Sequence, residues 1–225
     1  MKNRLTIFFS VFINFKKKFQ LKIISHIRPN NLAVGMMNKI PVIIESLCYL
    51  LSNLKKADKI HLVKLVYLAD KYHLMNYGRT ITGDEFIAFR NGPGGSRTTD
   101  VLDFDPYVLG EYLDYAHNMF KKSYGYQYMP GAKCRLEDLE MLSQTDIEAL
   151  EFSIKHFGTM DRWAVVDYTH RLQEWKQFEP LFKEKRIKRE LIKIEELLCD
   201  PKDEHFSVPP EHINQSLEII RGTFD

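Results

Sequence analysis

Cysteine is scarce in this sequence, and its placement excludes the common cysteine-based metal sites. Cys48, Cys134 and Cys199 are the only three cysteines among 225 residues, and none stands in a CxxC pair or beside histidines at zinc-ligand spacing. We therefore expect reduced, mostly buried thiols in a cytoplasmic protein, with no metal ion and no cofactor.

The body of the chain also lacks an apolar run long enough to cross a bilayer, which takes about 20 residues. A shorter apolar run, Leu5 to Phe15, lies within residues 1–35, which hold seven basic residues and no acidic one. We expect a mis-called start codon before Met36-Met37, with residues 1–35 absent or disordered in the working protein. A peripheral membrane anchor and an export signal are the alternatives.

A basic surplus is missing from the rest of the chain. Seven of the 32 basic residues lie within residues 1–35, so residues 36–225 hold 25 basic residues and all 30 acidic ones. A mildly acidic body is poorly suited to a phosphate backbone, so we expect no nucleic-acid partner. We expect no membrane partner either, unless residues 1–35 are a genuine anchor.

Known catalytic motifs are absent as well, and there is no nucleophile elbow, zincin helix or kinase signature. The segment GPGGS, ending at Ser96, lacks the lysine of a phosphate-binding loop, so a capped turn is the better interpretation. His170 could pair with Cys134 or Cys199 as a nucleophile, but a core histidine is the commoner case. The sequence therefore predicts a protein that is not an enzyme.

One set of polar residues keeps an enzymatic alternative open. Asp70 and His73 share a helix face, and Asp84 follows closely in the sequence. A metal-dependent hydrolase-like site could use all three side chains. We favour structural hydrogen bonds between helix and strand, because no second pair of ligands is evident.

Apolar residues recur at helical spacing over much of the chain. The pattern predicts a helix over 40–54, and a second from the N-cap Asp58 to about Asn76, ended by Gly78. The period then changes, which predicts a short strand within 80–90 and a tight turn over 91–95.

Further elements follow in the second half. We expect Ser96 to cap a helix reaching Leu102, a helix over about 105–118, and one or two strands within 124–135. A capping box at 142–146 opens a helix that ends at Gly158, and Thr159 caps the next. A charged helix over about 180–198 and a last helix over about 211–220 complete the prediction. The fold class is mainly α with a small β element (α+β), a single compact helical domain with a short strand and turn insert.

Two blocks of sequence resemble a known family. KLVYLADKYHLMNYGRTITGDEFIAFRNGP (Lys64 to Pro93) and LSQTDIEALEFSIKHFGTMDRWAVVDYTHRLQEWK (Leu142 to Lys176) are similar to the SocA-like antitoxin family, whose domain is called Panacea. The resemblance implies a Panacea domain over 37–176. Residues 177–225 lie outside it, and we expect them to form a helical C-terminal extension that packs on the same domain.

The resemblance also implies a function. Such an antitoxin neutralises a cognate toxin, encoded by a neighbouring gene, through direct protein contact. It does so either by blocking the toxin or as a proteolytic adaptor that delivers it to an ATP-dependent protease. A phage-associated regulatory module is a further alternative. The motif residues that would bind the partner or build the scaffold are Tyr67, Asp70, Tyr72, His73, Arg79, Gly83, Asp84, Arg90, Gly92, Pro93, Ser96, Thr169, His170, Trp175 and Lys176.

Overall fold

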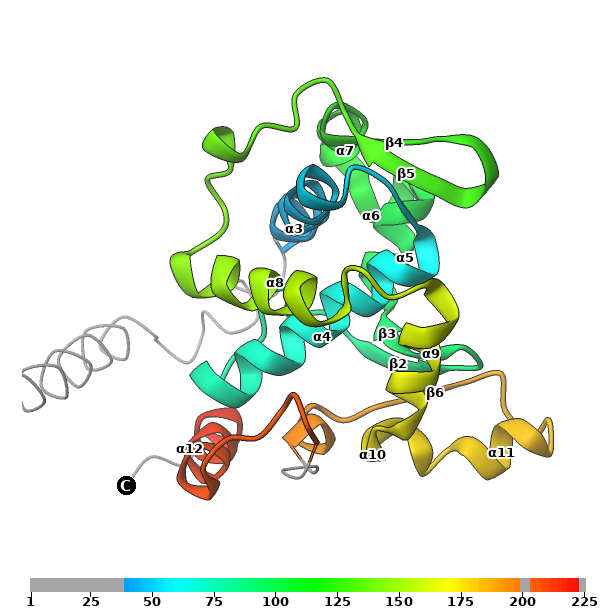
Figure 1. Cartoon of the computed structure of the whole chain (residues 1–225), viewed down its shortest axis with the longest axis vertical. Coiled ribbons are helices and arrows are strands. Elements are labelled where there is room, and N and C mark those ends of the chain that lie inside the picture. The colour runs from blue at the N-terminus through cyan, green and yellow to red at the C-terminus, as the bar shows by residue number, and fades with distance from the viewer. Residues whose placement is uncertain (1–38, 199–202, 223–225) are drawn as a thin grey trace, which may run out of the picture. The chain divides into compact units, whose positions relative to one another are not determined.

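A computed structural model describes residues 39–198 and 203–222 of the chain (Figure 1). The prediction for residues 1–35 and the thiol of Cys199 lie outside the described residues. The α-helices are α3 (Ile40–Leu54), α4 (Lys59–Tyr77), α5 (Ser96–Asp103), α6 (Pro106–Leu109), α7 (Leu113–Met119), α8 (Gln144–Phe157), α9 (Arg162–Arg171), α10 (Gln173–Lys176), α11 (Glu179–Lys183) and α12 (Pro210–Arg221). The strands are β1 (Ala57–Asp58), β2 (Phe86–Phe89), β3 (Gly92–Gly95), β4 (Phe120–Lys122), β5 (Gln127–Pro130) and β6 (Arg189–Leu191). Short 3₁₀ turns occupy Gly110–Tyr112, Tyr124–Tyr126, Leu136–Asp138 and Ile194–Leu198.

Helix α4 is the centre of the fold, and α8 packs along it (Figure 1). The Asp58 carboxylate caps its first turn by accepting a hydrogen bond from the His61 N–H, at 3.1 Å. Gly78 ends the helix in the left-handed conformation, with φ +72°. Helices surround α4 and two small sheets pack beside them. The predicted fold class, mainly α with a small β element, is confirmed.

The two sheets are antiparallel and have three strands each, in the orders β1-β5-β4 and β3-β2-β6. In the second sheet, Gly92 pairs with Phe89 and Gly95 pairs with Phe86. The predicted tight turn over 91–95 is therefore shorter than expected, because residues 90–91 form the turn and Gly92–Gly95 is a strand. Its glycines allow β3 to lie directly against α4, since a Cβ at Gly94 would collide with Val63 Cγ1.

The predicted strand within 80–90 is shorter than expected. Residues Phe86–Phe89 form β2, while the segment before them is a turn held by side-chain hydrogen bonds. The predicted strands within 124–135 are represented by β5, which pairs with both β1 and β4.

The predicted charged helix over 180–198 is wrong. Helix α11 ends at Lys183, and the chain then forms β6, in which Leu191 pairs with Ile87. The Ile192 N–H donates to the Phe86 carbonyl at 2.9 Å, and the Ile192 side chain is buried. Pairing with the open edge of β2 and burial of Ile192 stabilise the strand more than the alternating charges stabilise a helix. One ion pair at helical spacing, Glu179 with Lys183, is present in α11, with 2.9 Å between the charged groups.

Some helix starts follow the predicted capping chemistry and others differ from it. The capping box of Ser143 and Asp146 at α8 is confirmed, and Asp105 caps α6. The helix predicted over 105–118 is broken, however, into α6, a 3₁₀ turn and α7. Asp161, rather than Thr159, caps α9, because its carboxylate accepts hydrogen bonds from two backbone N–H groups of the first turn.

Helix α12 matches the predicted last helix and packs against α4. The Ser216 hydroxyl donates to the Leu74 carbonyl at 3.0 Å, and Ile219 lies over Gly78. Among residues 39–198 and 203–222, no helix combines the length and apolar character needed to span a membrane.

Candidate functional site

Several polar side chains of α4 are buried, although helices usually bury apolar side chains. Lys64, Asp70, Lys71 and His73 are each no more than 3% exposed. Each bonds to a different element of the fold, so the family motif in this helix connects elements that are far apart in the sequence. A buried charged or polar group without such a partner would destabilise the protein.

Lys71 and Glu174 join α4 to α10. Lys71 Nζ lies 2.6 Å from Glu174 Oε1, and the Tyr67 hydroxyl donates to the same oxygen at 2.6 Å. Burial, followed by the charge of Glu174, raises the pKa of Tyr67, so the phenol stays protonated and keeps donating. The ring of Phe206 packs 5.5 Å from the Lys71 ammonium.

Asp70 holds the turn that follows α4. Its carboxylate accepts hydrogen bonds from the Thr82 N–H at 2.9 Å and from the Thr82 hydroxyl at 2.5 Å. Burial raises the pKa of Asp70 to about 7, against the opposing effect of the hydrogen bonds from Thr82. Gly83, half-buried, continues this turn with φ +58°, which suits glycine.

Asp84 caps helix α5 from outside the helix. One carboxylate oxygen accepts from the Arg97 N–H at 2.9 Å, and the other accepts from the Thr98 N–H and hydroxyl, at 2.8 and 2.7 Å. The predicted cap, Ser96, is instead the first residue of α5. A carboxylate of the chain itself thus occupies the place where a bound anion would interact with a helix N-terminus.

His73 belongs to a third group of contacts, at the start of α8. Its Nδ1 lies 2.7 Å from the Arg79 carbonyl oxygen, and its Nε2 lies 3.0 Å from the Thr145 hydroxyl and 3.2 Å from Asp146 Oδ1. Burial lowers the pKa of His73 to about 4, so the ring is neutral at pH 7. The positive charge opposite Asp146 comes from Arg79, whose Nη2 lies 2.9 Å from Oδ1.

Strand β3 packs against a fourth group, formed by α4 and α9. The Lys64 ammonium donates to the Pro93 carbonyl, and a Cβ at Gly92 would come within 2.6 Å of the Thr169 hydroxyl and 2.8 Å of Lys64 Nζ. Burial lowers the pKa of Lys64. Gly92, at φ +93°, is therefore required both by its backbone conformation and by the close approach of two polar side chains.

His170 and Trp175 stack on each other near the same strand, with ring centroids 3.7 Å apart. The Trp175 indole N–H donates to the Phe89 carbonyl at 2.8 Å, which fixes α10 to β2. Trp175 is buried, so it contributes to the core rather than to an exposed surface.

Asp70, His73 and Asp84 thus have separate partners in the turn, at α8 and at α5. Within residues 39–198 and 203–222, no group of three or more histidine, cysteine, aspartate or glutamate side chains is arranged to hold a metal ion. Each of the three side chains makes hydrogen bonds to a different part of the fold.

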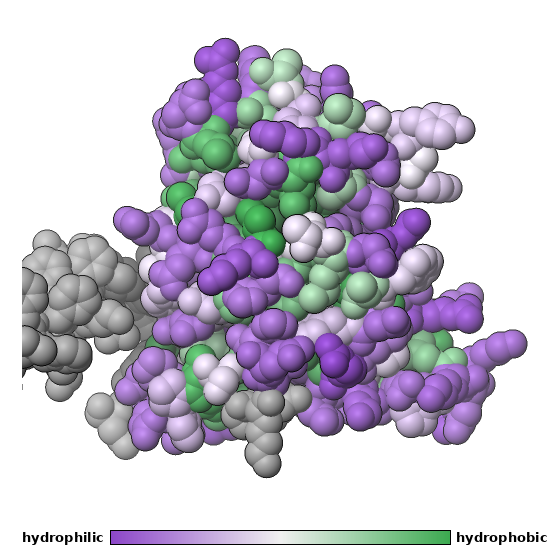
Figure 2. Space-filling model, in the orientation of Figure 1, coloured by the Kyte–Doolittle hydropathy of each residue, from purple (hydrophilic) through white to green (hydrophobic). Residues whose placement is uncertain are grey.

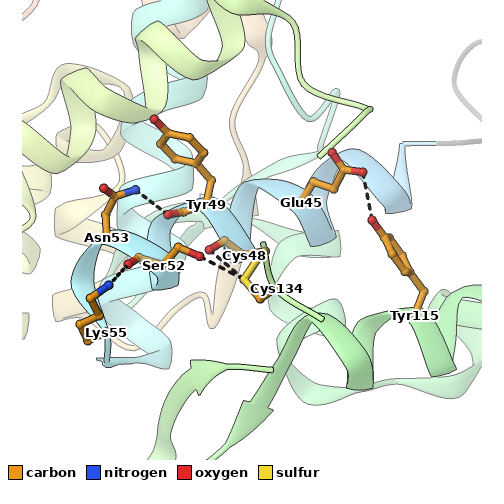
Figure 3. Close-up of a disulfide and its surroundings, with 8 residues drawn as sticks. All are labelled: Glu45, Cys48, Tyr49, Ser52, Asn53, Lys55, Tyr115 and Cys134. Atoms are coloured by element: carbon orange, nitrogen blue, oxygen red, sulfur yellow. Dashed lines mark hydrogen bonds between the residues drawn. A yellow bond between two sulfur atoms is a disulfide. The ribbon is translucent and has the colours of Figure 1, made fainter. Parts of the chain in front are cut away.

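Cys48 and Cys134 form a disulfide, which contradicts the expectation of reduced thiols for these two residues (Figure 3). The bond ties the segment after β5 to α3, across a sequence separation of 86 residues and a Cα–Cα distance of 5.8 Å. Cys134 also lies 3.2 Å from the Ser52 hydroxyl. Sequence reasoning missed the pair because the spacing of distant cysteines does not reveal which of them meet.

Few of the motif residues predicted from sequence are exposed. Arg79, Arg90 and Lys176 are exposed, and Tyr72 is half-buried and donates to Glu148 at 2.8 Å. The half-buried and buried remainder comprises Tyr67, Asp70, His73, Gly83, Asp84, Gly92, Pro93, Ser96, Thr169, His170 and Trp175. Most of the motif therefore lies within the described fold rather than on its surface.

The most exposed aromatic residues lie outside the predicted set. Tyr107, Tyr124 and Tyr126 are almost fully exposed, and Trp163 is more than half exposed. The signal in the sequence was the YGY triplet, Tyr124 to Tyr126, in which two tyrosines flank a turn glycine.

One comparison with known proteins identifies the family. The family model described as "Antitoxin SocA-like, Panacea domain" matches residues 62–176, slightly more than half of the chain, and both motif blocks lie inside this range. No curated protein and no solved structure matches. The resemblance noted from the two motif blocks is confirmed, and the chain belongs to the SocA-like antitoxin family with a Panacea domain.

Proposed function

We propose that this protein is the antitoxin of a toxin–antitoxin system and neutralises a toxin encoded by a neighbouring gene through direct protein contact. The observation that carries the proposal is the match to the antitoxin family over residues 62–176. Neutralisation by contact needs a stable scaffold and an accessible surface, and no catalytic group.

The contacts of the motif residues support a scaffold role. Lys71 and Glu174 use their charges on each other, and Asp84 uses its carboxylate on the start of α5. Contact with the partner then requires other side chains on the surface, and of the motif residues Arg79 and Arg90 are exposed.

Co-expression tests the proposal directly. Each gene adjacent to this one is expressed from an inducible promoter, in the cytoplasm of a bacterial host, with and without this chain. We expect one neighbouring product to stop growth and the chain to restore it. If no neighbouring product is toxic, or if the chain rescues none of them, the proposal is wrong.

Blocking and proteolytic delivery give different results in the same assay. A toxin that is delivered to an ATP-dependent protease disappears when the chain is expressed, and it persists in a host that lacks the protease. A toxin that is blocked keeps its level and purifies in complex with the chain. Pulse-chase measurement of the toxin in both hosts separates the two modes.

The hydrolase-like alternative makes a separate prediction. It requires Asp70, His73 and Asp84 to share one metal ion, whereas each of them bonds to a different part of the fold. Metal analysis of the purified protein tests it, and a stoichiometric ion that is lost in the His73→Gln variant would favour the enzyme over the antitoxin.

A further inference from the structure

The β4–β5 hairpin carries two tyrosines whose side chains are exposed and pack little against the rest of the fold. Tyr124 is 96% exposed and Tyr126 is 82% exposed. Gly125 and Tyr126 both adopt the left-handed conformation, with φ +70° and φ +65°. Glycine or asparagine would suit the second position better than a bulky residue, and an exposed ring gains little packing energy to offset that strain.

The base of the hairpin is anchored in the core, so its tip is held in place. Phe120 and Tyr128 are buried, and the Tyr128 hydroxyl donates to the Leu102 carbonyl at 2.7 Å. The Ser123 N–H donates to the Gln127 carbonyl at 2.6 Å and closes the turn. A pre-organised tip loses little conformational entropy when a partner binds it.

A further exposed aromatic side chain, that of Trp163, lies at the start of α9. It is 55% exposed, and the Arg162 guanidinium lies 5.2 Å from its ring centroid. Arg162 Nε is 3.9 Å from Asp58 Oδ2, and Asp58 pairs with Gln127, the residue next to Tyr126. The start of α9 thus adjoins the hairpin through β1, on the same side of the molecule in Figure 1.

We call Tyr124, Tyr126, Arg162 and Trp163 the aromatic surface. In the orientation of Figure 1, pale side chains of weak polarity project from the outline at the level of the hairpin (Figure 2). Tryptophan, tyrosine and arginine are the residue types most often found to dominate binding energy at protein interfaces.

Charge indicates the kind of partner. The 16 residues from Phe120 to Arg135 include four basic residues and no acidic one, although residues 36–225 as a whole carry more acidic than basic residues. Such a local basic segment complements an acidic patch on another protein. It is a poor footprint for nucleic acid, because the acidic body repels an extended phosphate backbone.

We infer that the aromatic surface is the toxin-binding surface, and that it docks on an acidic patch with recesses for the two hairpin tyrosines. The inference rests on the proposed antitoxin function and names the part of the molecule that performs it. Tyr124 and Tyr126 supply buried area at the centre of the contact, while Lys121 and Lys122 steer the approach of the acidic partner.

The test uses the full chain and the toxin from the adjacent gene, each purified. In the hairpin variant, Tyr124→Ser is combined with Tyr126→Gly, which removes both rings and relieves the left-handed backbone, so its melting temperature should not fall. The matched control is Tyr107→Ser, which removes a tyrosine that is also 96% exposed but lies on α6.

We expect the hairpin variant to bind the toxin at least tenfold more weakly than wild type in calorimetry and to lose growth protection. The control should keep wild-type affinity. In a second variant, Lys121→Glu with Lys122→Glu, association should slow, and the salt dependence of the association rate should weaken.

The outcomes separate the two proposals. If the wild-type chain protects cells and the hairpin variant protects and binds equally well, the aromatic surface does not bind the toxin. The proposed antitoxin function is then unaffected. If wild type fails against every neighbouring gene, both proposals fall. Salt-sensitive binding of the wild-type chain to a single-stranded oligonucleotide, lost in the hairpin variant, would assign this surface to nucleic acid instead and overturn the inference.

Discussion

Lys71 and Glu174 form a fully buried ion pair that joins the central helix α4 to α10, with 2.6 Å between Nζ and Oε1. Removing one partner leaves the other charge buried and unpaired. We expect Lys71→Met or Glu174→Leu alone to lower the free energy of unfolding by about 3–5 kcal/mol, as is typical of broken buried pairs.

The double variant, Lys71→Met with Glu174→Leu, provides the control for this prediction. Replacing both charges by apolar groups removes the unpaired charge, so the loss should be smaller than the sum of the two single losses. Urea unfolding of the four proteins gives the coupling energy. Strictly additive losses would mean that the two side chains do not stabilise each other.

The carboxylate of Asp84 should contribute more to stability than the serine at the start of α5. Because Asp84 accepts hydrogen bonds from Arg97 and Thr98, we expect Asp84→Ala to cost about 2 kcal/mol, the upper range for an N-cap. Ser96→Ala should change the free energy of unfolding by less than about 0.5 kcal/mol. Thermal melting of both variants measures the two losses of stability. An equal loss of stability in Asp84→Ala and Ser96→Ala would contradict the assignment of Asp84 as the cap.

Asp70 and His73 should give opposite dependences of stability on pH. Burial raises the pKa of Asp70 from 3.8 to about 7, so its contribution to stability is fully present below pH 3.8 and is lost as the pH rises through 7. Burial lowers the pKa of His73 from 6.5 to about 4, so its contribution is present above pH 6.5 and is lost as the pH falls through 4.

The two dependences oppose each other over about pH 4 to 6.5 in the wild-type protein. With Asp70→Asn, the His73 dependence remains, and stability should rise with pH across this window. With His73→Gln, stability should fall as the pH rises. Urea midpoints at pH 4.5, 5.5 and 6.5 measure the slopes, and equal slopes in the two variants would refute the assignment.

The Cys48–Cys134 disulfide should make stability sensitive to reductant. The bond constrains the unfolded chain over a sequence separation of 86 residues, so its reduction should lower the free energy of unfolding by about 2–5 kcal/mol. The variant with both cysteines changed to serine should show this lowered stability whether or not dithiothreitol is present, because it has no disulfide to reduce. A wild-type melting temperature that dithiothreitol leaves unchanged would argue against the bond.

The sequence by itself determined the elements whose signals are local. Helices α3, α4, α8 and α12 begin and end close to their predicted bounds, because apolar spacing, capping side chains and terminal glycines act within a few residues. The family was also readable, since its two motif blocks are continuous in the sequence. The identity of these motif residues did not reveal that most of them are buried.

Only the tertiary structure decided the features that depend on distant partners. Gly92–Gly95 became a strand because α4 and α9 leave room there for backbone alone, and Arg189–Leu191 became a strand because β2 offered an open edge. Asp84 became the cap of α5, and Cys48 met Cys134, only because folding brings their segments together. Helix α4 buries the polar side chains of Lys64, Asp70, Lys71 and His73 for the same reason. Each has a partner that local sequence cannot show, and those partners cancel a desolvation cost that would otherwise exclude the residues from the core.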